Sequence, residues 1–224
     1  MATVYTDDTE SSPVDPFVLR SACDALALFP LPGTVLLPGS ALPLHVFEPR
    51  YRQLVKDVLA DGFMTIPQLR PDGDGTYFPY ACMGKILAHR ELADGRFNIL
   101  VQPVARIRLG EELLGLPQPY RMGRAELLEE RAFIPRDLEH IGARLLALIG
   151  PLLGGMGERG VEMRRGLASM DLLKVAEAVA PFVVGDPDER QAYIAENDPV
   201  ARAVLVETAV LGVMAALGAG TGDA

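Results

Sequence analysis

The sequence predicts an α+β protein, in which a small β barrel with one early helix is followed by a bundle of helices. Prolines and glycines interrupt the apolar runs of residues 26–39, a pattern typical of short edge strands rather than of a central parallel sheet. Apolar residues recur with a helical period in residues 49–61, and then again only beyond residues 131–136, where the period changes from about 2 to about 3.6 residues. We therefore expect a barrel in residues 17–130 and a helical bundle in residues 131–224.

Composition limits the class of protein. The chain has 224 residues, of which 49% are hydrophobic and 23% charged, as in a folded protein with one large or two small domains. Its first residues lack the basic start and apolar core of a secretory signal. The longest strongly apolar stretch, Ala209 to Ala219, is about half of the roughly 20 residues that a membrane span needs. Two cysteines, Cys23 and Cys82, are too few for a disulfide framework, so we expect a cytoplasmic protein without a membrane partner.

The charges are unevenly distributed along the chain, whose formal net charge is −9. Residues 1–16 contain four acidic residues and no lysine or arginine, and we expect them to form a disordered acidic leader. Residues 17–130 carry 12 basic and 13 acidic side chains, and residues 131–224 carry 9 and 13. No segment is strongly basic, which argues against nucleic acid and anionic lipid as partners.

The first half contains one helix between several strands. Pro49 follows Glu48 and suits the first helical position, and apolar residues from Tyr51 to Leu59 recur on one face until Gly62 ends the helix. A turn with Asp94-Gly95 predicts a hairpin between two of the strands. The strands are expected at residues 63–69, 82–90, 97–102, 104–109 and 120–128.

The second half contains the signals of four helices. The first has an apolar stripe formed by Leu138, Ile141, Leu145, Leu148 and Leu152, and it ends at Gly154-Gly155. A connector rich in Gly and Arg is expected up to about Gly166, after which Ser169 is a candidate N-cap for a helix that ends at Pro181. Asp186-Pro187 and Asp198-Pro199 each combine a capping side chain with a proline at the first helical position, and they predict two further helices. The last helix should reach about Leu217.

A long motif resembles the N-terminal domain of Lon proteases. It comprises Leu28-Phe29-Pro30-Leu31-Pro32, then Val35-Leu36-Leu37-Pro38-Gly39, and then Leu42-Pro43-Leu44-His45-Val46-Phe47-Glu48-Pro49-Arg50-Tyr51-Arg52. Weaker similarity continues through Met83–Ile86, Asp94–Arg96, Pro119–Arg121 and, in the helical half, Asp171-Leu172, Arg190-Gln191, Asn197-Asp198 and Arg202, so that it spans about residues 26–215. The sequence departs from these domains in Gln102–Ile107, where they usually have a glycine before an arginine segment flanked by aromatic residues.

The resemblance implies a PUA-like pseudo-barrel followed by a helix bundle, and a polypeptide substrate or a partner protein as what it binds. In full-length Lon proteases this region helps to engage polypeptide substrates and to assemble the hexamer, so an oligomer is compatible with it. The ATPase and peptidase parts of such enzymes would follow this region. The chain has no G-x-x-x-x-G-K-[ST] motif to hold nucleotide phosphates and no segment left to supply a Ser–Lys pair. We therefore expect a non-catalytic module without a cofactor, linked to proteolysis through its family.

The residues that we consider for a binding or structural role lie in one motif: Pro38, Leu44, His45, Phe47, Glu48, Arg50, Tyr51 and Arg52. One interpretation makes Glu48 and His45 an acid–base pair. The alternative places Glu48 at the positive start of a helix, paired with Arg50 or Arg52, and His45 at the end of a strand. We favour the alternative because the geometry of the helix start already explains Glu48.

Other candidate sites have simpler interpretations. The loop Asp72-Gly73-Asp74-Gly75 lacks the later ligands of a calcium loop, and we expect a solvated turn. The cysteines and histidines are scattered without the close spacing of a zinc site, so no metal is expected. Arg106 and Arg108 alternate on a strand, which favours an outward basic face over a phosphate site. The apolar residues 204–217 form either a buried bundle helix, which we favour, or a helix that completes an oligomer interface.

Three functions remain open from the sequence. The first is a module that binds unfolded or extended polypeptide, or an adaptor in proteolysis, through open strand edges and apolar grooves. The second is a PUA-like regulator that binds RNA, against which the charge argues. The third is a small hydrolase or a ligand-dependent regulator, which requires a pocket where the side chains of residues 45–52 converge.

Overall fold

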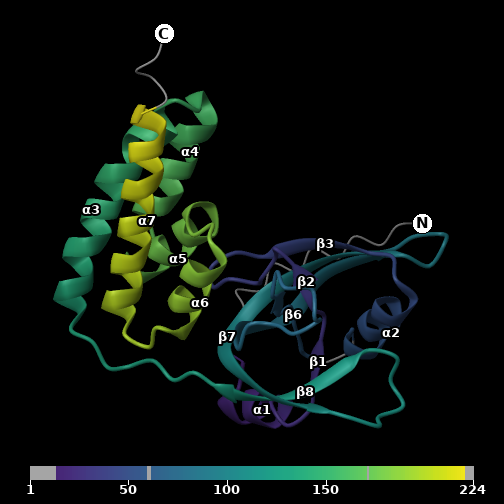
Figure 1. Ribbon diagram of the computed structural model, residues 1–224. Helices are drawn as coiled ribbons and strands as arrows, with labels where there is room; N and C mark the ends of the chain where they lie inside the picture. Colours follow the sequence, from purple (N-terminus) through teal and green to yellow (C-terminus); the bar gives the residue numbers. More distant parts are fainter. Residues whose placement is uncertain (1–13, 60–61, 171, 220–224) are drawn as a thin grey trace. The chain divides into compact units, whose positions relative to one another are not determined.

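The computed structural model describes residues 14–59, 62–170 and 172–219. They fall into two compact units that meet in the sequence between Leu128 and Glu129. Within the described residues, the first unit contains strands β1 to β8 with helices α1 and α2, and the second contains helices α3 to α7 (Figure 1). The predicted α+β class is therefore confirmed. Of the predicted leader, residues 1–13 lie outside the described residues, whereas Asp15 and Pro16 already begin α1 (Pro16–Ala22).

Five strands of the first unit form a closed ring, in the order β7, β6, β4, β1 and β8, with β8 returning to β7. The ring closes because β7 is long: one of its edges pairs with β6, and the second half of the other edge pairs with β8. β3 pairs only with residues 97–101 of β7, and so it forms an edge of the sheet. The strands are β1 (Leu26–Leu28), β3 (Leu42–Val46), β4 (Met64–Thr65), β6 (Tyr80–Glu91), β7 (Phe97–Leu113) and β8 (Arg121–Leu127). The short strands β2 (Leu31–Pro32) and β5 (Gln68–Leu69) form a separate parallel pair.

The turn of the β6–β7 hairpin was predicted, but the continuity of β7 was not. Gly95 has φ +77° in the turn, as the predicted hairpin requires. The two strands predicted at residues 97–102 and 104–109 are one strand, interrupted by a bulge: Ala105 pairs with Met83 and Pro103 with Gly84, so Val104 has no opposite residue. Proline has no N–H for the strand ladder, and a bulge is a position where a strand tolerates this. The departure from the Lon pattern in residues 102–107 thus lies at this bulge.

The barrel unit has two apolar clusters, one on each face of β1. Ala27 packs in the cluster that contains Tyr51, Leu54 and Val55 of α2. Its neighbours Leu26 and Leu28 point to the opposite face and belong to the cluster that contains Leu19 of α1. Successive residues of a strand face opposite sides, so a strand covered by a helix on each side is buried throughout, as β1 is.

Helix α2 (Pro49–Val58) confirms the predicted early helix. The buried residues Tyr51, Leu54, Val55 and Val58 form its apolar face, and proline occupies the first helical position. The predicted strand at residues 63–69 is divided into β4 and β5, and Pro67 lies between them. A proline in this position removes one ladder donor, which explains the interruption.

The helical unit comprises α3 (Pro135–Gly154), α4 (Gly157–Ala168), α5 (Leu172–Val183), α6 (Pro187–Ala195) and α7 (Pro199–Ala219). The predicted starts of α6 and α7 are confirmed: Asp186 accepts from the backbone N–H of Asp188, and Asp198 accepts from that of Val200. The buried stripe of α3 is Ile141, Leu145, Ile149 and Leu153, so its last two positions differ by one residue from those predicted.

Three predictions for the helical unit are wrong. The Gly- and Arg-rich segment is not a connector but helix α4, and Ser169 caps the end of α4 rather than the start of α5. Its hydroxyl donates to the carbonyl of Gly166 at 2.7 Å. Helix α5 does not end at Pro181 but continues to Val183, because a proline near the end of a helix disturbs only the preceding turn.

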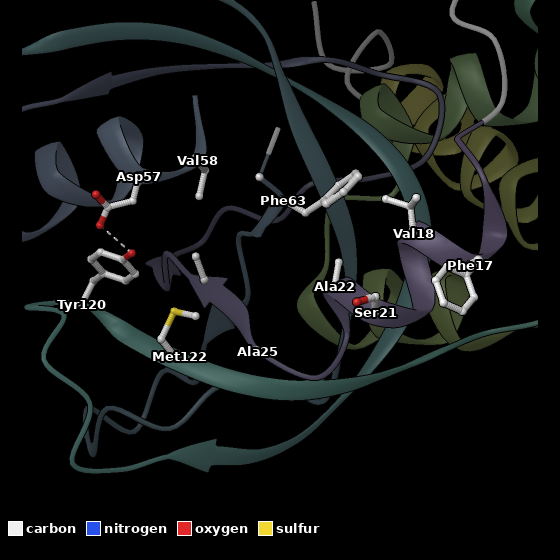
Figure 2. A pocket seen from close by; sticks show the side chains of 12 residues that line it. Phe17, Val18, Ser21, Ala22, Ala25, Asp57, Val58, Phe63, Tyr120 and Met122 are labelled. Carbon is white, nitrogen blue, oxygen red and sulfur yellow. Dashed lines mark hydrogen bonds between the residues drawn. The ribbon is translucent and has the colours of Figure 1, made fainter. Parts of the chain in front are cut away.

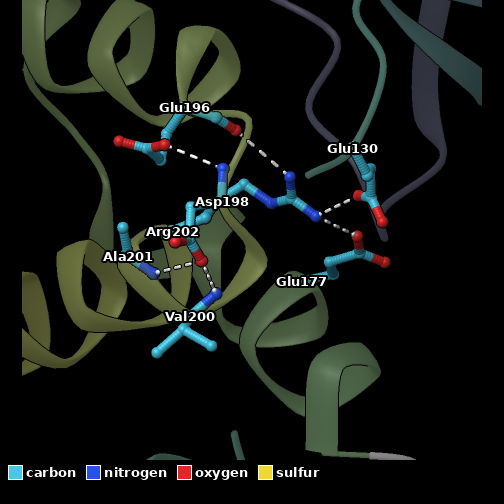
Figure 3. A network of polar contacts seen from close by, with 7 residues as sticks. All are labelled: Glu130, Glu177, Glu196, Asp198, Val200, Ala201 and Arg202. Carbon is cyan, nitrogen blue, oxygen red and sulfur yellow. Dashed lines mark hydrogen bonds and ion pairs between the residues drawn. The ribbon is translucent and has the colours of Figure 1, made fainter. Parts of the chain in front are cut away.

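A buried arginine organises the polar interior of the helical unit (Figure 3). The side chain of Arg202 in α7 is 1% exposed, and its guanidinium group lies 2.5 Å from Glu130 and 3.4 Å from Glu177. It also donates to the carbonyl of Glu196 at 3.2 Å. A buried charge is tolerated only where such partners surround it, so Arg202 fixes Glu130, the loop before α7 and α5 around one point.

Helix α7 is not the buried central helix that we favoured from the sequence. Its residues 199–217 have a mean hydropathy of 1.9, and only 22% of that window is buried. Ala203, Val206 and Val210 face the bundle, whereas Val204 and Leu211 are 40% and 49% exposed. Among the described residues, α7 is the one helix that is long and apolar enough to cross a membrane. The apolar stretch predicted from the sequence was too short, because it began at Ala209 whereas the apolar window of the helix begins at Pro199.

Candidate functional site

The residues of the predicted motif do not converge on one pocket. Pro38 and Tyr51 are buried in the barrel unit, and Leu44 is half-buried on β3. Phe47 follows β3 and exposes 61% of its surface. The motif therefore combines residues of the core with residues of the surface, and neither His45 nor Glu48 lines either of the two hollows described below.

His45 lies near the end of β3, opposite Asn98 of β7. Its Nδ1 is 2.7 Å from Asn98 Oδ1, and its Nε2 is 3.2 Å from a guanidinium nitrogen of Arg96. A guanidinium group can only donate, so Nε2 accepts and Nδ1 donates. Both ring nitrogens are thus engaged in binding the hairpin to the edge strand.

The charged residues at the start of α2 are also engaged. Arg50 donates from Nε to Glu48 Oε2 at 3.0 Å, and its guanidinium group lies 4.5 Å from the centre of the Tyr51 ring. The guanidinium group of Arg52 lies directly against Gly95 of the hairpin turn. Glu48 is therefore paired with Arg50, one of the two expected partners, and it does not form an acid–base pair with His45.

The remaining sequence candidates offer no reactive site. Within the described part of the chain, no three His, Cys, Asp or Glu side chains are grouped as a metal ion requires. Asp74 accepts hydrogen bonds from the backbone N–H and the hydroxyl of Thr76, at 2.8 and 2.6 Å, and so stabilises a turn. The expected outward pair of arginines is wrong in one member: Arg108 is exposed, but Arg106 is buried.

The edge strand β3 is a limited surface for strand addition. It is the one strand of the closed sheet that pairs on a single side within the described residues. Pro43 is the second of its five residues, and a proline supplies no N–H to a neighbouring strand. β3 therefore offers one main-chain donor fewer than a strand without proline, and strand addition depends on such donors.

A hollow of about 460 Å³ opens beside α1 in the barrel unit. We call it the α1 hollow. Its volume lies in the range of small-molecule and side-chain pockets. Twelve residues from five segments line it: Phe17, Val18, Ser21, Ala22, Ala25, Ala27, Asp57, Val58, Gly62, Phe63, Tyr120 and Met122.

The α1 hollow has a buried apolar floor and an exposed apolar rim (Figure 2). Phe63 and Val58 are 9% and 7% exposed, whereas Phe17 and Val18 on α1 are 78% and 44% exposed. Val58 belongs to one core cluster and Phe63 to the other, so the hollow lies where the two clusters separate. Exposed aromatic and branched side chains beside such a hollow are a typical surface for an apolar ligand group.

One polar pair stands at the end of the hollow opposite Phe17 (Figure 2). The hydroxyl of Tyr120 donates to Asp57 Oδ2 at 2.8 Å, and Gln53 donates to Oδ1 at 2.7 Å. Burial raises the pKa of the Tyr120 hydroxyl, and the hydrogen bond to Asp57 raises it further. Tyr120 therefore remains a donor at neutral pH and holds the Asp57 carboxylate toward the hollow.

The described lining of the α1 hollow suits binding. It includes the hydroxyls of Ser21 and Tyr120 and the carboxylate of Asp57, but no histidine, cysteine or lysine. In Figure 2, Ser21 lies on α1, far from the Asp57–Tyr120 pair. Among the described lining residues, Ser21 therefore has no base within reach.

The α1 hollow was not predicted from the sequence. Helix α1 has seven residues and buries only Leu19, which is too little for a visible period. One signal was present: Asp15 followed by Pro16 is the same cap-then-proline start that was recognised at Asp186 and Asp198, and Asp15 accepts from the N–H of Phe17 at 2.8 Å.

Comparison with protein families confirms the resemblance seen in the sequence. The family model of the ATP-dependent protease La (LON) substrate-binding domain matches residues 25–210. Lon protease 2 of Sorangium cellulosum is 25% identical over 203 residues, and Lon protease 2 of Myxococcus xanthus is 25% identical over 191 residues. These matches cover 87% and 81% of the chain but 24% and 23% of the two relatives, so the chain spans about a quarter of their length.

Solved structures agree on the fold. The N-terminal domain of a Mycobacterium avium complex Lon protease superimposes with a TM-score of 0.67 at 15% identity, over 83% of this chain and 97% of that one. A Lon N-terminal domain protein from Xanthomonas campestris gives a TM-score of 0.59 at 22% identity, over 82% and 97% of the two chains. Helix α1 precedes residue 25, where the family match begins. One wall of the α1 hollow is thus formed by residues that the family match does not include.

Proposed function

Because the chain belongs to the family of Lon substrate-binding domains, we propose that it binds unfolded or extended polypeptide and that the α1 hollow receives an apolar side chain of that polypeptide. The observation that carries this proposal is the combination of a buried apolar floor with the exposed rim residues Phe17 and Val18. A folded protein keeps its apolar side chains inside, so a hollow of this kind selects chains that expose them.

The proposal describes a binding module without a reaction of its own. The two candidate sites support this, because His45 and Glu48 are engaged by other partners and the described lining of the α1 hollow has no histidine, cysteine or lysine. Such a module acts by holding a polypeptide, either for itself or as an adaptor that presents it to a separate protease. The adaptor role follows from the family and would be recognised by delivery of a bound polypeptide to a Lon-type enzyme.

The first test measures binding of an unfolded and a folded form of one protein. Reduced, carboxymethylated α-lactalbumin and native α-lactalbumin, both fluorescently labelled, are titrated with the full chain while anisotropy is recorded. We expect saturable binding of the unfolded form only. Equal binding of both forms, or no binding at protein concentrations up to about 1 mM, would contradict the proposal.

A matched pair of variants locates the site. Phe17 and Phe47 are both exposed phenylalanines of the barrel unit, but only Phe17 lines the α1 hollow. Phe17→Asp should weaken binding of the unfolded protein by about tenfold, because an exposed aromatic residue that the ligand would cover is replaced by a charge, and Phe47→Asp should leave it unchanged. The opposite result would move the site to the motif of residues 38–52, and an RNA that binds with a steep salt dependence would favour the regulator instead.

A further inference from the structure

A second hollow of about 480 Å³ adjoins the first one on α2. Its walls are the first two turns of α2 and the segment before β8, with prolines at residues 49, 117 and 119. Asp57 lines both hollows. Tyr120, which donates to Asp57, directly follows the residues 117–119 that line the second hollow. The Asp57–Tyr120 pair therefore stands at the junction of the two hollows.

One face of α2 runs along this whole surface. Pro49, Gln53 and Asp57 are spaced four residues apart, which places them on one side of the helix. At 1.5 Å per residue these positions span about 12 Å, the length of about three to four residues of an extended chain. The α1 hollow continues from Asp57 toward α1. The two hollows together thus form one track that accommodates a short extended segment.

The track presents one carboxylate with unused acceptor capacity. The carboxylate of Asp57 accepts two hydrogen bonds, from Gln53 and Tyr120, whereas a carboxylate has room for about four. Arg50 is the one cation among the residues that line the two hollows, and it is paired with Glu48. The complement of this surface is a chain that brings N–H donors and a positive charge.

We propose that the track selects extended polypeptide segments in which a lysine or arginine lies within about three residues of the apolar side chain. The apolar side chain occupies the α1 hollow, and the basic side chain pairs with Asp57. This inference rests on the proposed function and adds a sequence preference to it. The net charge of −9 also attracts basic segments from a distance.

The experiment uses three unstructured, labelled peptides and the full chain. All contain one Leu-Phe pair. The first has a lysine two residues after the pair, the second has a glutamate there, and the third has the lysine ten residues away. We expect the first peptide to bind about threefold to fivefold more tightly than the other two, the range of a partly exposed ion pair, and high salt should reduce the difference.

Two variants with the same loss of charge separate a local effect from a general one. Asp57→Asn keeps the shape of the side chain and should abolish the preference for the first peptide. Asp94→Asn removes a charge from the hairpin turn, outside the track, and should preserve it. Circular dichroism checks that both variants are folded.

The outcomes distinguish the two proposals. Equal affinities for the three peptides, or equal effects of the two variants, would overturn the track inference while leaving polypeptide binding in place. Binding of none of the peptides, together with no binding of the unfolded protein, would overturn the proposed function itself. A preference that survives in Asp57→Asn would place the basic subsite elsewhere.

Discussion

At the residue scale, Arg202 is the side chain on which the interior of the helical unit depends most. It is 1% exposed and faces two carboxylates. The pairing with Glu130 and Glu177 makes this buried charge tolerable, and the carbonyl of Glu196 accepts from the same guanidinium group. Nothing in the local sequence marks this role, because an Arg in a helix is usually exposed.

Arg202→Ala should lower the free energy of unfolding of the helical unit by about 1.5–3 kcal/mol, because it removes a buried side chain together with its hydrogen bonds to Glu130, Glu177 and the carbonyl of Glu196. Urea denaturation followed by circular dichroism measures the change. Arg144→Ala is the control: Arg144 is exposed and pairs with Glu207 at 2.6 Å, so its loss should cost much less stability than the loss of Arg202. Equal effects of the two variants would contradict the role given to burial.

A second residue-scale prediction concerns pH. Hydrogen bonds from Arg121, together with its positive charge, hold the pKa of Glu112 below its ordinary value of 4.5. The resulting stability is complete above about pH 4.5 and is lost as the pH falls through the lower pKa of the folded state. Glu112→Gln should therefore be less stable than the natural protein at pH 7, and the difference in free energy of unfolding should shrink as the pH falls below 4.5.

The same variant has a spectroscopic signature. Burial raises the pKa of Tyr77 to about 12, and the negative charge of Glu112 contributes. In Glu112→Gln the tyrosine should ionise at a lower pH, which ultraviolet absorbance of the phenolate measures. Glu126→Gln, at an exposed carboxylate 3.9 Å from Arg108, should change neither the acid stability nor the tyrosine titration.

At the scale of elements, local signals predicted α6 and α7, which begin with a cap and a proline, although the same signal before α1 was overlooked. Asp186 and Asp198 cap α6 and α7 as expected. Helix α4 was missed because Gly157, Gly160 and Gly166 favour a connector, although packing against α3 makes the segment helical. The α1 hollow was missed for a related reason: its five segments meet only in the folded barrel, so no spacing in the sequence reveals them.

Substitution of Asp186 and of Ser169 tests which of these two residues caps the start of a helix. Asp186→Ala should destabilise the helical unit by about 1 kcal/mol, because two N–H groups at the start of α6 lose their acceptor. Ser169→Ala should cost a few tenths of a kcal/mol or less, since this exposed hydroxyl only donates to the carbonyl of Gly166. Thermal denaturation ranks the two variants, and a larger effect of Ser169→Ala would reverse the assignment.

Two glycines of α4 should respond in opposite directions. A Cβ at Gly160 would collide with the backbone carbonyl of Leu153, whereas a Cβ at Gly166 would meet nothing within 4 Å. Gly160→Ala should therefore destabilise the unit by about 1–3 kcal/mol, and Gly166→Ala should stabilise it by about 0.5–1 kcal/mol through its greater helix propensity. Chemical denaturation of both variants tests this, and destabilisation by both would contradict it.

At the scale of the whole molecule, the chain consists of two units with separate interiors. Both apolar clusters around β1 lie within residues 14–128, and the Arg202 network lies within residues 129–219. The family was recognisable from the motif in residues 28–52 because those residues build β3, the start of α2 and the buried segment before them. The motif therefore predicted the fold of the barrel better than it predicted a binding site.

The separation of the interiors predicts separate unfolding. Hydrogen exchange of Arg202→Ala, followed by mass spectrometry, should show faster exchange in peptides from residues 129–219 and unchanged exchange in peptides from residues 14–128. Binding of unfolded protein should persist in this variant, since the α1 hollow lies in the barrel unit. Faster exchange throughout the chain would show that the two units unfold as one.

The contacts of Leu128 and Glu130 determine where the chain can be divided to separate the two units. The backbone N–H of Leu128 still donates to Arg106 of the barrel, and Glu130 already belongs to the pocket of Arg202. A graft of the barrel onto another scaffold must therefore be cut between these two residues. A barrel fragment that ends after Glu130 would remove a partner of Arg202 from the helical unit. A barrel fragment that ends before Leu128 would lose the hydrogen bond from Leu128 to Arg106 at the end of the last strand.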